Sequence, residues 1–156
     1  MLMGTSVNKG ELLELLGTPF SSIVLADGTD ETENLKGVPK LKEVRMNDQS
    51  STLKGKAFNL EQFVDYADGS VVSKILLKKE IGNITLFAFD KGQGLSEHTA
   101  PFDAVVYILD GEAEITIGGK PQNVSAGEML IMPANIAHAL QAKAPFKMLL
   151  VMIRGE

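Results

Sequence analysis

The chain has 156 residues, a formal net charge of −5 and no cysteine. That length suits one domain with its own core, and the missing cysteines exclude disulfides, thiolate nucleophiles and iron–sulfur clusters. Because the lysines are scattered and no stretch resembles a secretory signal or a membrane span, we expect a cytoplasmic protein without nucleic-acid or membrane contacts.

The chain begins with a predicted short amphipathic helix over Asn8–Leu16. Asn8 and Glu11 have the spacing of a capping box, and Gly17 and Pro19 end the helical pattern. A helix of this length is not stable alone. Its leucines are therefore expected to bury against the rest of the fold or against a second subunit.

A polar segment follows, from Asp27 to Gly55, and it has neither helical nor strand periodicity. This composition predicts an extended arm. We therefore divide the chain into residues 1–55, which comprise the N-terminal helix and the arm, and residues 56–156, which form one β-domain.

Strands dominate the second part, after one turn that Asn59 and Gln62 are placed to cap. Short segments rich in β-branched, aromatic and aliphatic residues alternate with turn formers such as Asp110-Gly111. Because no helix-length segment separates them, the pattern predicts an antiparallel sandwich or barrel rather than βαβ units. The predicted strands cover residues 70–79, 83–91, 102–111, 112–119, 128–133 and 146–153.

Two kinds of strand differ in their periodicity. Residues 112–119 alternate polar with apolar, as a strand with one wet face does, whereas residues 104–109 and 148–153 are apolar at every position. The interior of a small barrel covers only one face of a strand, so the other face of these two needs a separate cover. The N-terminal arm and a second subunit are the candidates, and we expect a homodimer.

A spaced pattern of glycine and histidine lies in the middle of the strand-rich part. Gly92 is followed after five residues by His98, and Gly111 closes the pattern. It resembles the first motif of the cupin superfamily, G-x5-H-x-H-x3,4-E-x6-G. Ala100 stands at the position of the second histidine in that motif, and Ala104 stands at the position of the glutamate.

A second pattern follows after a short hairpin. Gly127, Pro133 and His138 are similar to the second cupin motif, G-x5-P-x-G-x2-H-x3-N, with Asn135 at its second glycine and Ala142 at its asparagine. The matched glycines and proline lie where chain reversals need a positive φ or a fixed turn. The resemblance implies an all-β fold, namely the antiparallel cupin β-barrel, also called a double-stranded β-helix or jelly roll.

The only two histidines both fall on motif positions, so we expect them to meet inside the barrel near its mouth. Because side chains alternate between the two faces of a strand, the residues that point into the barrel together with the histidines can be predicted. The result is a largely apolar pocket with two imidazoles, which is typical of a small-molecule site. The predicted ligand-binding residues are His98, His138, Ser96, Phe102, Val106 and Leu140.

Other polar and sulfur-bearing side chains near the motifs are less suited to the site. Glu97 and Asp103 are acidic, but alternation points both away from the interior unless a bulge shifts the register. Four methionines on the predicted strands are interpreted as fillers of irregular gaps: Met129, Met132, Met148 and Met152.

Cupins that bind iron, manganese, nickel or zinc typically supply three histidines and one glutamate, and here half of that set is alanine. Two neutral imidazoles hold a divalent ion less firmly than a set that includes a carboxylate. The favoured hypothesis is therefore a protein that binds a small organic molecule, with His98 and His138 orienting a carboxylate or hydroxyl group. The alternatives are a metal-dependent oxygenase or isomerase with a divalent transition metal on His98 and His138, and a non-catalytic structural or dimerisation module.

Overall fold

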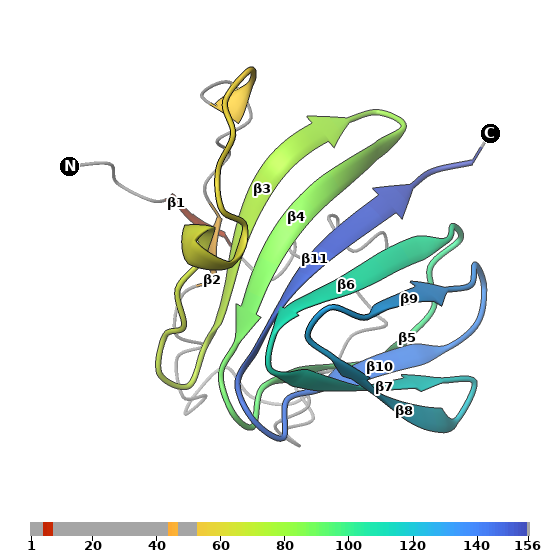
Figure 1. The fold of residues 1–156 in the computed structure, drawn as a ribbon. Helices are drawn as coiled ribbons and strands as arrows, with labels where there is room; N and C mark the ends of the chain where they lie inside the picture. Colours follow the sequence, from red (N-terminus) through yellow and green to blue (C-terminus); the bar gives the residue numbers. More distant parts are fainter. Residues whose placement is uncertain (1–4, 8–43, 47–52, 156) are drawn as a thin grey trace, which may run out of the picture.

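The computed structural model describes residues 5–7, 44–46 and 53–155. These residues form antiparallel β-sheet with one short 3-10 turn (Figure 1). The predicted helix over Asn8–Leu16 and most of the predicted arm lie outside the described residues. Within the described part, no helix combines the length and the apolarity needed to cross a bilayer.

Nine of the described strands build the main body as two sheets. The order is β3-β4-β11-β6-β9 in the five-stranded sheet and β5-β10-β7-β8 in the four-stranded sheet. A separate pair, β1 with β2, precedes them, and all neighbouring strands are antiparallel. The elements are β1 Thr5–Val7, β2 Val44–Met46, η2 Glu61–Phe63, β3 Val71–Lys79, β4 Gly82–Phe89, β5 Gly94–His98, β6 Ala104–Asp110, β7 Glu112–Ile117, β8 Lys120–Ser125, β9 Met129–Met132, β10 His138–Gln141 and β11 Phe146–Ile153.

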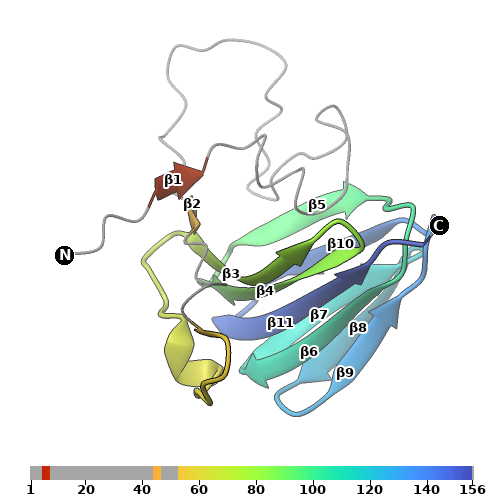
Figure 2. The ribbon, with the colours of Figure 1, turned by 90° about the horizontal axis from the view of Figure 1, so that it is seen from above.

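The main core lies between the two sheets, which face each other in Figure 2. Phe87, Ile115 and Phe146 are fully buried there, and the rings of Phe89 and Phe146 stack with their centroids 4.6 Å apart. Burial along β11 alternates at every second residue, as expected for a strand whose one face lines a core. The predicted all-β antiparallel barrel is therefore confirmed.

A second, smaller core lies on the outer face of the five-stranded sheet. The segment 53–64 crosses this face, and Val64 is fully buried against Leu86 and Ala88 of β4. Figure 2 shows the η2 turn on the side of the sheet that faces away from β5 and β10. The chain immediately before the barrel thus covers part of the outer face that the sequence predicts to need a cover.

Polar contacts hold the same segment in place. The backbone N–H of Gln62 donates to Asn59 Oδ1 at 3.0 Å, so the predicted cap is confirmed. Lys147 Nζ on β11 donates to the carbonyl oxygen of Glu61 at 2.8 Å. These contacts fix the turn against the sheet without adding a charged group to the core.

Strands β5, β8 and β10 are not among the six strands whose bounds were predicted. The predicted hairpin after Gly111 implied β8, and the alternation used around His98 and His138 treated their segments as strands. β8 is a largely exposed edge strand of mostly polar residues, so its sequence lacks the alternation of polar and apolar residues that would indicate a strand. β5 and β10 have five and four residues, too few for a period to stand out. Because β5 and β10 carry the two histidines, these short strands are the ones that position the candidate site.

Candidate functional site

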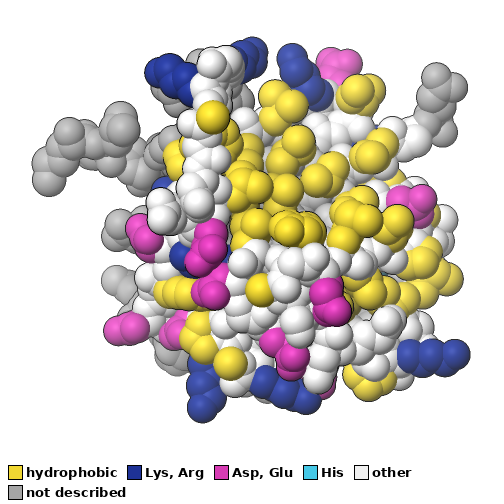
Figure 3. All heavy atoms as spheres, viewed as in Figure 1, with side chains coloured by type: hydrophobic (Ala, Val, Ile, Leu, Met, Phe, Trp, Pro, Cys, Tyr) yellow, Lys and Arg dark blue, Asp and Glu magenta, His cyan; other side chains and the backbone are white. Residues whose placement is uncertain are grey.

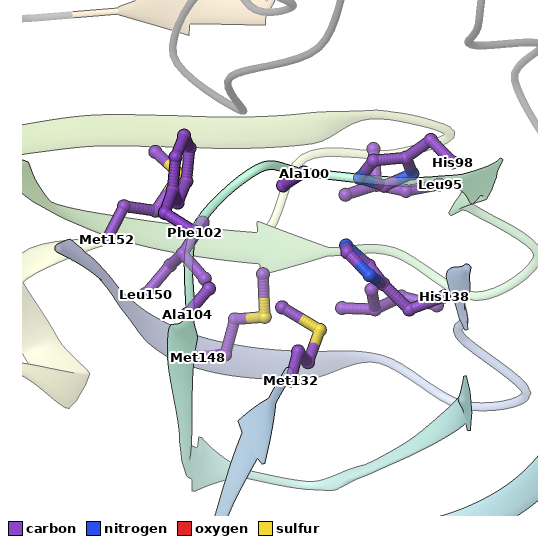
Figure 4. A pocket seen from close by; sticks show the side chains of 11 residues that line it. Leu95, His98, Ala100, Phe102, Ala104, Met132, His138, Met148, Leu150 and Met152 are labelled. Atoms are coloured by element: carbon purple, nitrogen blue, oxygen red, sulfur yellow. The ribbon is translucent and has the colours of Figure 1, made fainter. Parts of the chain in front are cut away.

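The two histidines lie opposite each other on neighbouring strands. His98 ends β5 and His138 begins β10, and the two are direct partners in the antiparallel pairing. Their ring centroids are 4.4 Å apart and the rings meet edge to face at 65° (Figure 4). The side chains are 5% and 3% exposed. The fold therefore brings both imidazoles to one place at the wall of the main core.

Each imidazole is held by a backbone carbonyl oxygen two residues earlier in the chain. His98 Nδ1 lies 2.7 Å from the carbonyl oxygen of Ser96, and His138 Nδ1 lies 3.0 Å from that of Ile136. A carbonyl oxygen only accepts hydrogen bonds, so both Nδ1 atoms carry the proton and donate. In a neutral ring this leaves Nε2 unprotonated. Both rings thus present a free lone pair on the side away from the backbone.

Neither Nε2 atom has a hydrogen-bond partner among the described residues. In that part of the chain, the one fully buried side-chain polar atom without a partner is Ser73 Oγ. Since the Nε2 atoms do not fall in this class, they remain accessible to a molecule the size of water. The site therefore offers two acceptors to an incoming group.

Burial lowers the pKa of both imidazoles from their ordinary value near 6.5. For His98 the hydrogen bond to Ser96 raises the pKa and the neighbouring His138 lowers it, but burial has the largest effect. The hydrogen bond to Ile136 opposes burial at His138 in the same way. Both rings are consequently neutral at neutral pH, which keeps both lone pairs available.

A small cavity of about 10 Å³ lies beside the two rings. This is room for about one water molecule. Figure 4 shows Met132 and Met148 reaching into the same space from β9 and β11. Apart from the histidines, the lining is apolar and consists of Leu95, Ala100, Phe102, Ala104, Met132, Leu140, Met148, Leu150 and Met152.

Of the residues predicted to face the ligand, Phe102 and Leu140 line the cavity beside the histidines. Val106 does not line it: the side chain is fully buried deeper in the main core. Ser96 does not line it either and is only half-buried. The prediction from strand alternation that Ser96 points into the cavity together with His98 was therefore wrong.

A β-bulge explains the position of Ser96. In the pairing of β5 with β10, His98 is opposite His138, but Leu95 rather than Ser96 is opposite Leu140. One extra residue on β5 reverses the facing of every side chain before it. Leu95 thus takes the cavity position, and Ser96 contributes only its carbonyl oxygen to the site.

The acidic residues near the motifs stay outside the cavity. Glu97 is exposed despite the bulge. Asp103 is also exposed, and its Oδ1 accepts a hydrogen bond of 2.8 Å from the backbone N–H of Ala134. Asp103 thereby holds the turn that leads toward His138. Of the four methionines, Met129 is exposed, whereas the other three are lining residues that the sequence interpretation treated only as fillers.

The described residues do not fit a resident divalent metal ion. No group of three or more histidine, aspartate or glutamate side chains able to hold a metal occurs in this part of the chain. Ala100 and Ala104, each 3% exposed, occupy the two motif positions where a histidine and a glutamate would complete the set. Two imidazole nitrogens in an otherwise apolar lining leave most of the coordination to other molecules.

Comparisons with known proteins agree with this architecture. The family model described as "Cupin domain" matches residues 85–153. The crystal structure of a conserved protein of unknown function, SPY1581 from Streptococcus pyogenes, is 41% identical with a TM-score of 0.63, over 65% of this chain and 90% of that one.

Two further relatives are similar over comparable stretches. A cupin 2 conserved barrel domain protein from Leptotrichia buccalis is 44% identical with a TM-score of 0.60, over 62% of this chain and 47% of that one. The uncharacterized protein SCO3923 from Streptomyces coelicolor is 29% identical over 84 residues, which are 53% of this chain and 80% of that protein. The names of these three proteins state no ligand or reaction.

Proposed function

Given that this chain belongs to the cupin superfamily, we propose that it binds a small organic molecule through His98 and His138 and holds no permanent divalent metal. One observation carries this proposal: two neutral imidazoles from different strands meet in an apolar lining with both Nε2 lone pairs free. Two unpartnered acceptors in an otherwise apolar lining favour a ligand that donates hydrogen bonds.

The tautomer narrows the chemical class of the ligand. A hydroxyl or amino group can donate a hydrogen bond to Nε2 of His98 or His138. A carboxylate has only acceptor oxygens, and these would be repelled by the lone pairs of the two Nε2 atoms. The sequence alone left a carboxylate and a hydroxyl group open as the bound group. The hydrogen bonds of the two Nδ1 atoms favour the hydroxyl or amino group over the carboxylate.

The size of the cavity limits how the ligand enters. With a volume of about 10 Å³, the cavity admits only a head group unless side chains move. Met132, Met148 and Met152 are part of the lining, and methionine side chains have the rotational freedom to repack. The ligand is thus expected to place a donor between the histidines and to displace methionine side chains with its apolar body.

The same small volume favours one alternative, a non-catalytic structural module in which the barrel core is simply filled. The metal-dependent enzyme lacks comparable support, because the described residues supply no carboxylate to the site. These two alternatives predict different results in the experiment below.

The test is a ligand titration monitored by NMR on the full chain. Phenols, alcohols and amines are compared with their methyl ethers and with matched carboxylates. The donors are expected to bind about tenfold more tightly than the ethers, the factor that corresponds to about 1.4 kcal/mol for one net hydrogen bond. This preference is expected to disappear in the His98→Ala, His138→Ala double variant.

The Ser96→Ala variant is the matched control, because it keeps the carbonyl oxygen that holds His98 and changes a side chain outside the cavity. It is expected to bind like the wild type. Equal affinities in the wild type and the double variant would overturn the anchoring role. Elemental analysis adds a second criterion: a stoichiometric transition metal that is lost with either histidine would replace this proposal by the metal-dependent one.

A further inference from the structure

The two free acceptors of the candidate site are close enough to share one donor atom. Two acceptors that each lie about 2.9 Å from the same atom can be up to about 6 Å apart, and the ring centroids of His98 and His138 are 4.4 Å apart. Both rings line the same cavity, and Figure 4 shows them turned toward each other from β5 and β10. One head-group atom between the rings can therefore reach both of them.

The volume of the cavity limits the head group to about one atom. The cavity measures about 10 Å³, which is room for about one water molecule. A ligand that enters it displaces solvent, and it loses affinity wherever it fails to replace the hydrogen bonds that solvent makes. A water molecule has two O–H groups on one atom. A head group that matches it must likewise carry two hydrogens on one atom.

This requirement separates an amino group from a hydroxyl group. A hydroxyl has one hydrogen, so it can donate to Nε2 of His98 or to that of His138 but leaves the other acceptor unpaired. An acceptor that is removed from water without a partner weakens binding. A primary amino group has two N–H groups on one nitrogen and can donate to both Nε2 atoms at once.

The lining of the cavity does not suit a charged head group. Apart from the two histidines, the lining side chains that the structure describes are aliphatic, aromatic or thioether groups, so none of them is acidic. The carboxylates of Glu97 and Asp103 are exposed and lie outside the cavity. An ammonium group would therefore be buried without a counter-ion, which is unfavourable. Alkylamines are protonated at neutral pH, whereas aromatic amines and carboxamides are uncharged.

The lining also disfavours a carboxamide. Its NH₂ group has two hydrogens, but its carbonyl oxygen needs a donor as well. The two imidazole N–H groups already donate to the carbonyl oxygens of Ser96 and Ile136, and the other lining side chains have no N–H or O–H group. An aromatic ring needs no such donor, and it makes favourable contacts with thioether sulfur atoms such as those of Met132 and Met148.

We propose that the head group bound between His98 and His138 is an uncharged primary aromatic amine, whose two N–H groups donate to the two Nε2 atoms. This inference rests on the proposed function, because it assumes that a ligand binds through both histidines. It narrows the ligand from any hydrogen-bond donor to a donor that uses two hydrogens of one atom. The nitrogen lone pair is delocalised into the aromatic ring and needs no donor from the protein.

The aromatic ring of the ligand is expected to extend toward Phe102. Figure 3 shows the outer face of the five-stranded sheet, where hydrophobic side chains gather over β4, β11, β6 and β9 and neither histidine reaches the surface. The sheet thus closes the cavity on this side. Phe102, between β5 and β6, is at 8% the most exposed residue of the lining. A ligand ring beside it forms an aromatic pair with the Phe102 ring.

A titration of the full chain with four small aromatic probes tests the proposal. Aniline, phenol and toluene share one ring and place two, one and no donor hydrogens on a single heavy atom. Aniline is expected to bind about tenfold more tightly than phenol, and phenol about tenfold more tightly than toluene, one factor for each hydrogen bond. Benzylamine, which is protonated at neutral pH, is expected to bind no more tightly than toluene.

Single variants separate the number of hydrogen bonds from the strength of each donor. His98→Phe and His138→Phe each keep an aromatic ring and remove one acceptor. With one acceptor left, the second N–H of aniline has no partner, so the preference for aniline over phenol is expected to disappear in both variants. Ser96→Ala is the matched control, because the Ser96 side chain lies outside the cavity, and it is expected to keep the full preference.

A measurement on the wild type keeps the proposal testable if the variants fail to fold. A donor hydrogen bond to Nε2 stabilises the neutral imidazole, so saturating aniline is expected to lower the pKa of both histidines, followed by NMR, relative to saturating toluene. Toluene fills the same space without a donor and thus controls for burial. A lowered pKa at only one histidine would overturn the bridging arrangement.

The affinities also distinguish a failure of this inference from a failure of the proposed function. Phenol that binds as tightly as aniline, with both tighter than toluene, would overturn the primary amine and leave the histidine anchors in place. Toluene that binds as tightly as phenol and aniline would overturn the proposed function itself. A preference for aniline that persists in both phenylalanine variants would place its second N–H on another acceptor, and benzylamine that binds more tightly than aniline would indicate a site for a cation.

Discussion

His98 and His138 are direct cross-strand partners, and the pairing of β5 with β10 becomes irregular immediately beyond them. The bulge on β5 and the start of β10 thus meet at the point where the two rings touch. Each ring is oriented by a carbonyl oxygen two residues earlier in the chain, from Ser96 in β5 and from Ile136 in the turn before β10. The site therefore depends on local backbone geometry more than on distant side chains.

Stability is expected to fall as the pH drops below about 6.5. In the folded chain, burial lowers the pKa of both imidazoles below the value they have when unfolded. Above pH 6.5 both states are neutral and the free energy of unfolding is unaffected. At lower pH the unfolded chain binds protons first, so the free energy of unfolding decreases by at most about 1.4 kcal/mol per pH unit for each histidine. The decrease ends once the pH lies below the folded pKa values.

Urea unfolding at pH 5, 6, 7 and 8 measures this dependence. The His98→Ala, His138→Ala double variant provides the reference, because it lacks both titrating rings and is expected to show little change from pH 7 to 5. Asp90, whose pKa is lowered mainly by its hydrogen bond from the Gly69 N–H, titrates below this range. A wild-type slope that equals the slope of the variant would contradict the assignment of the pH dependence to the histidines.

Replacing Ser73 by alanine is expected to leave the protein as stable or to stabilise it by about 1 kcal/mol. The Ser73 side chain is fully buried on β3, and its Oγ finds no hydrogen-bond partner among the described residues. Removing an unsatisfied hydroxyl removes its desolvation cost. Ser125→Ala, which deletes a hydroxyl bonded to Glu112, is the control in a urea titration. A loss above 1 kcal/mol at Ser73 would reveal a partner, such as a buried water.

The strand pattern predicts much of the fold because burial follows alternation wherever strands are regular. The continuously apolar stretch of β11 indeed has both faces in use, with Met148 in the main core and Leu149 beside the second core. The facing predicted for Ser96 from strand alternation was wrong, because the bulge on β5 adds one residue and no residue type in this segment indicates it. Local regularity therefore limits how well residue facing can be predicted.

The properties of the site itself were only partly predictable. Motif spacing predicted that His98 and His138 would meet, since both positions belong to recurring turns and strands. The tautomers depend on backbone carbonyl directions, and the small cavity depends on how methionines from β9 and β11 pack. Neither property has a period or a spacing in the sequence, so neither can be derived before the structure is known.

Substituting alanine at Gly111 is expected to cost about 3 kcal/mol or more, whereas the same change at Gly127 costs about 1 kcal/mol. Both glycines have a positive φ, of 74° and 89°, so both variants carry backbone strain. Only at Gly111 would the added Cβ collide with the carbonyl oxygen of Pro145 and press on Phe146; around Gly127 there is open space. Urea midpoints compare the two. Equal losses would mean that backbone strain alone explains both positions.

Asn135 adopts a φ of 62° in the turn between β9 and β10, and it is the only non-glycine residue with a positive φ among the described residues. Its backbone N–H donates to the carbonyl oxygen of Ala100 at 2.7 Å, which ties this turn to the cavity wall. Asparagine tolerates the left-handed conformation better than other residues with a Cβ. This explains how it can stand where the second motif has glycine.

Asn135→Gly is therefore expected to be more stable than Asn135→Ala by about 1 kcal/mol. The left-handed backbone conformation at this position is sterically unfavourable for alanine, which has a Cβ, but not for glycine. Urea unfolding of both variants gives this difference. Asn123→Ala, a change at an exposed position of β8, is the control and should match the wild type. Since the turn leads directly into His138, the alanine variant should also shift the imidazole NMR signals of that residue more than the glycine variant does. Alanine and glycine variants of equal stability would show that the turn relaxes to a negative φ, and the conformation of Asn135 would then have no part in holding the site.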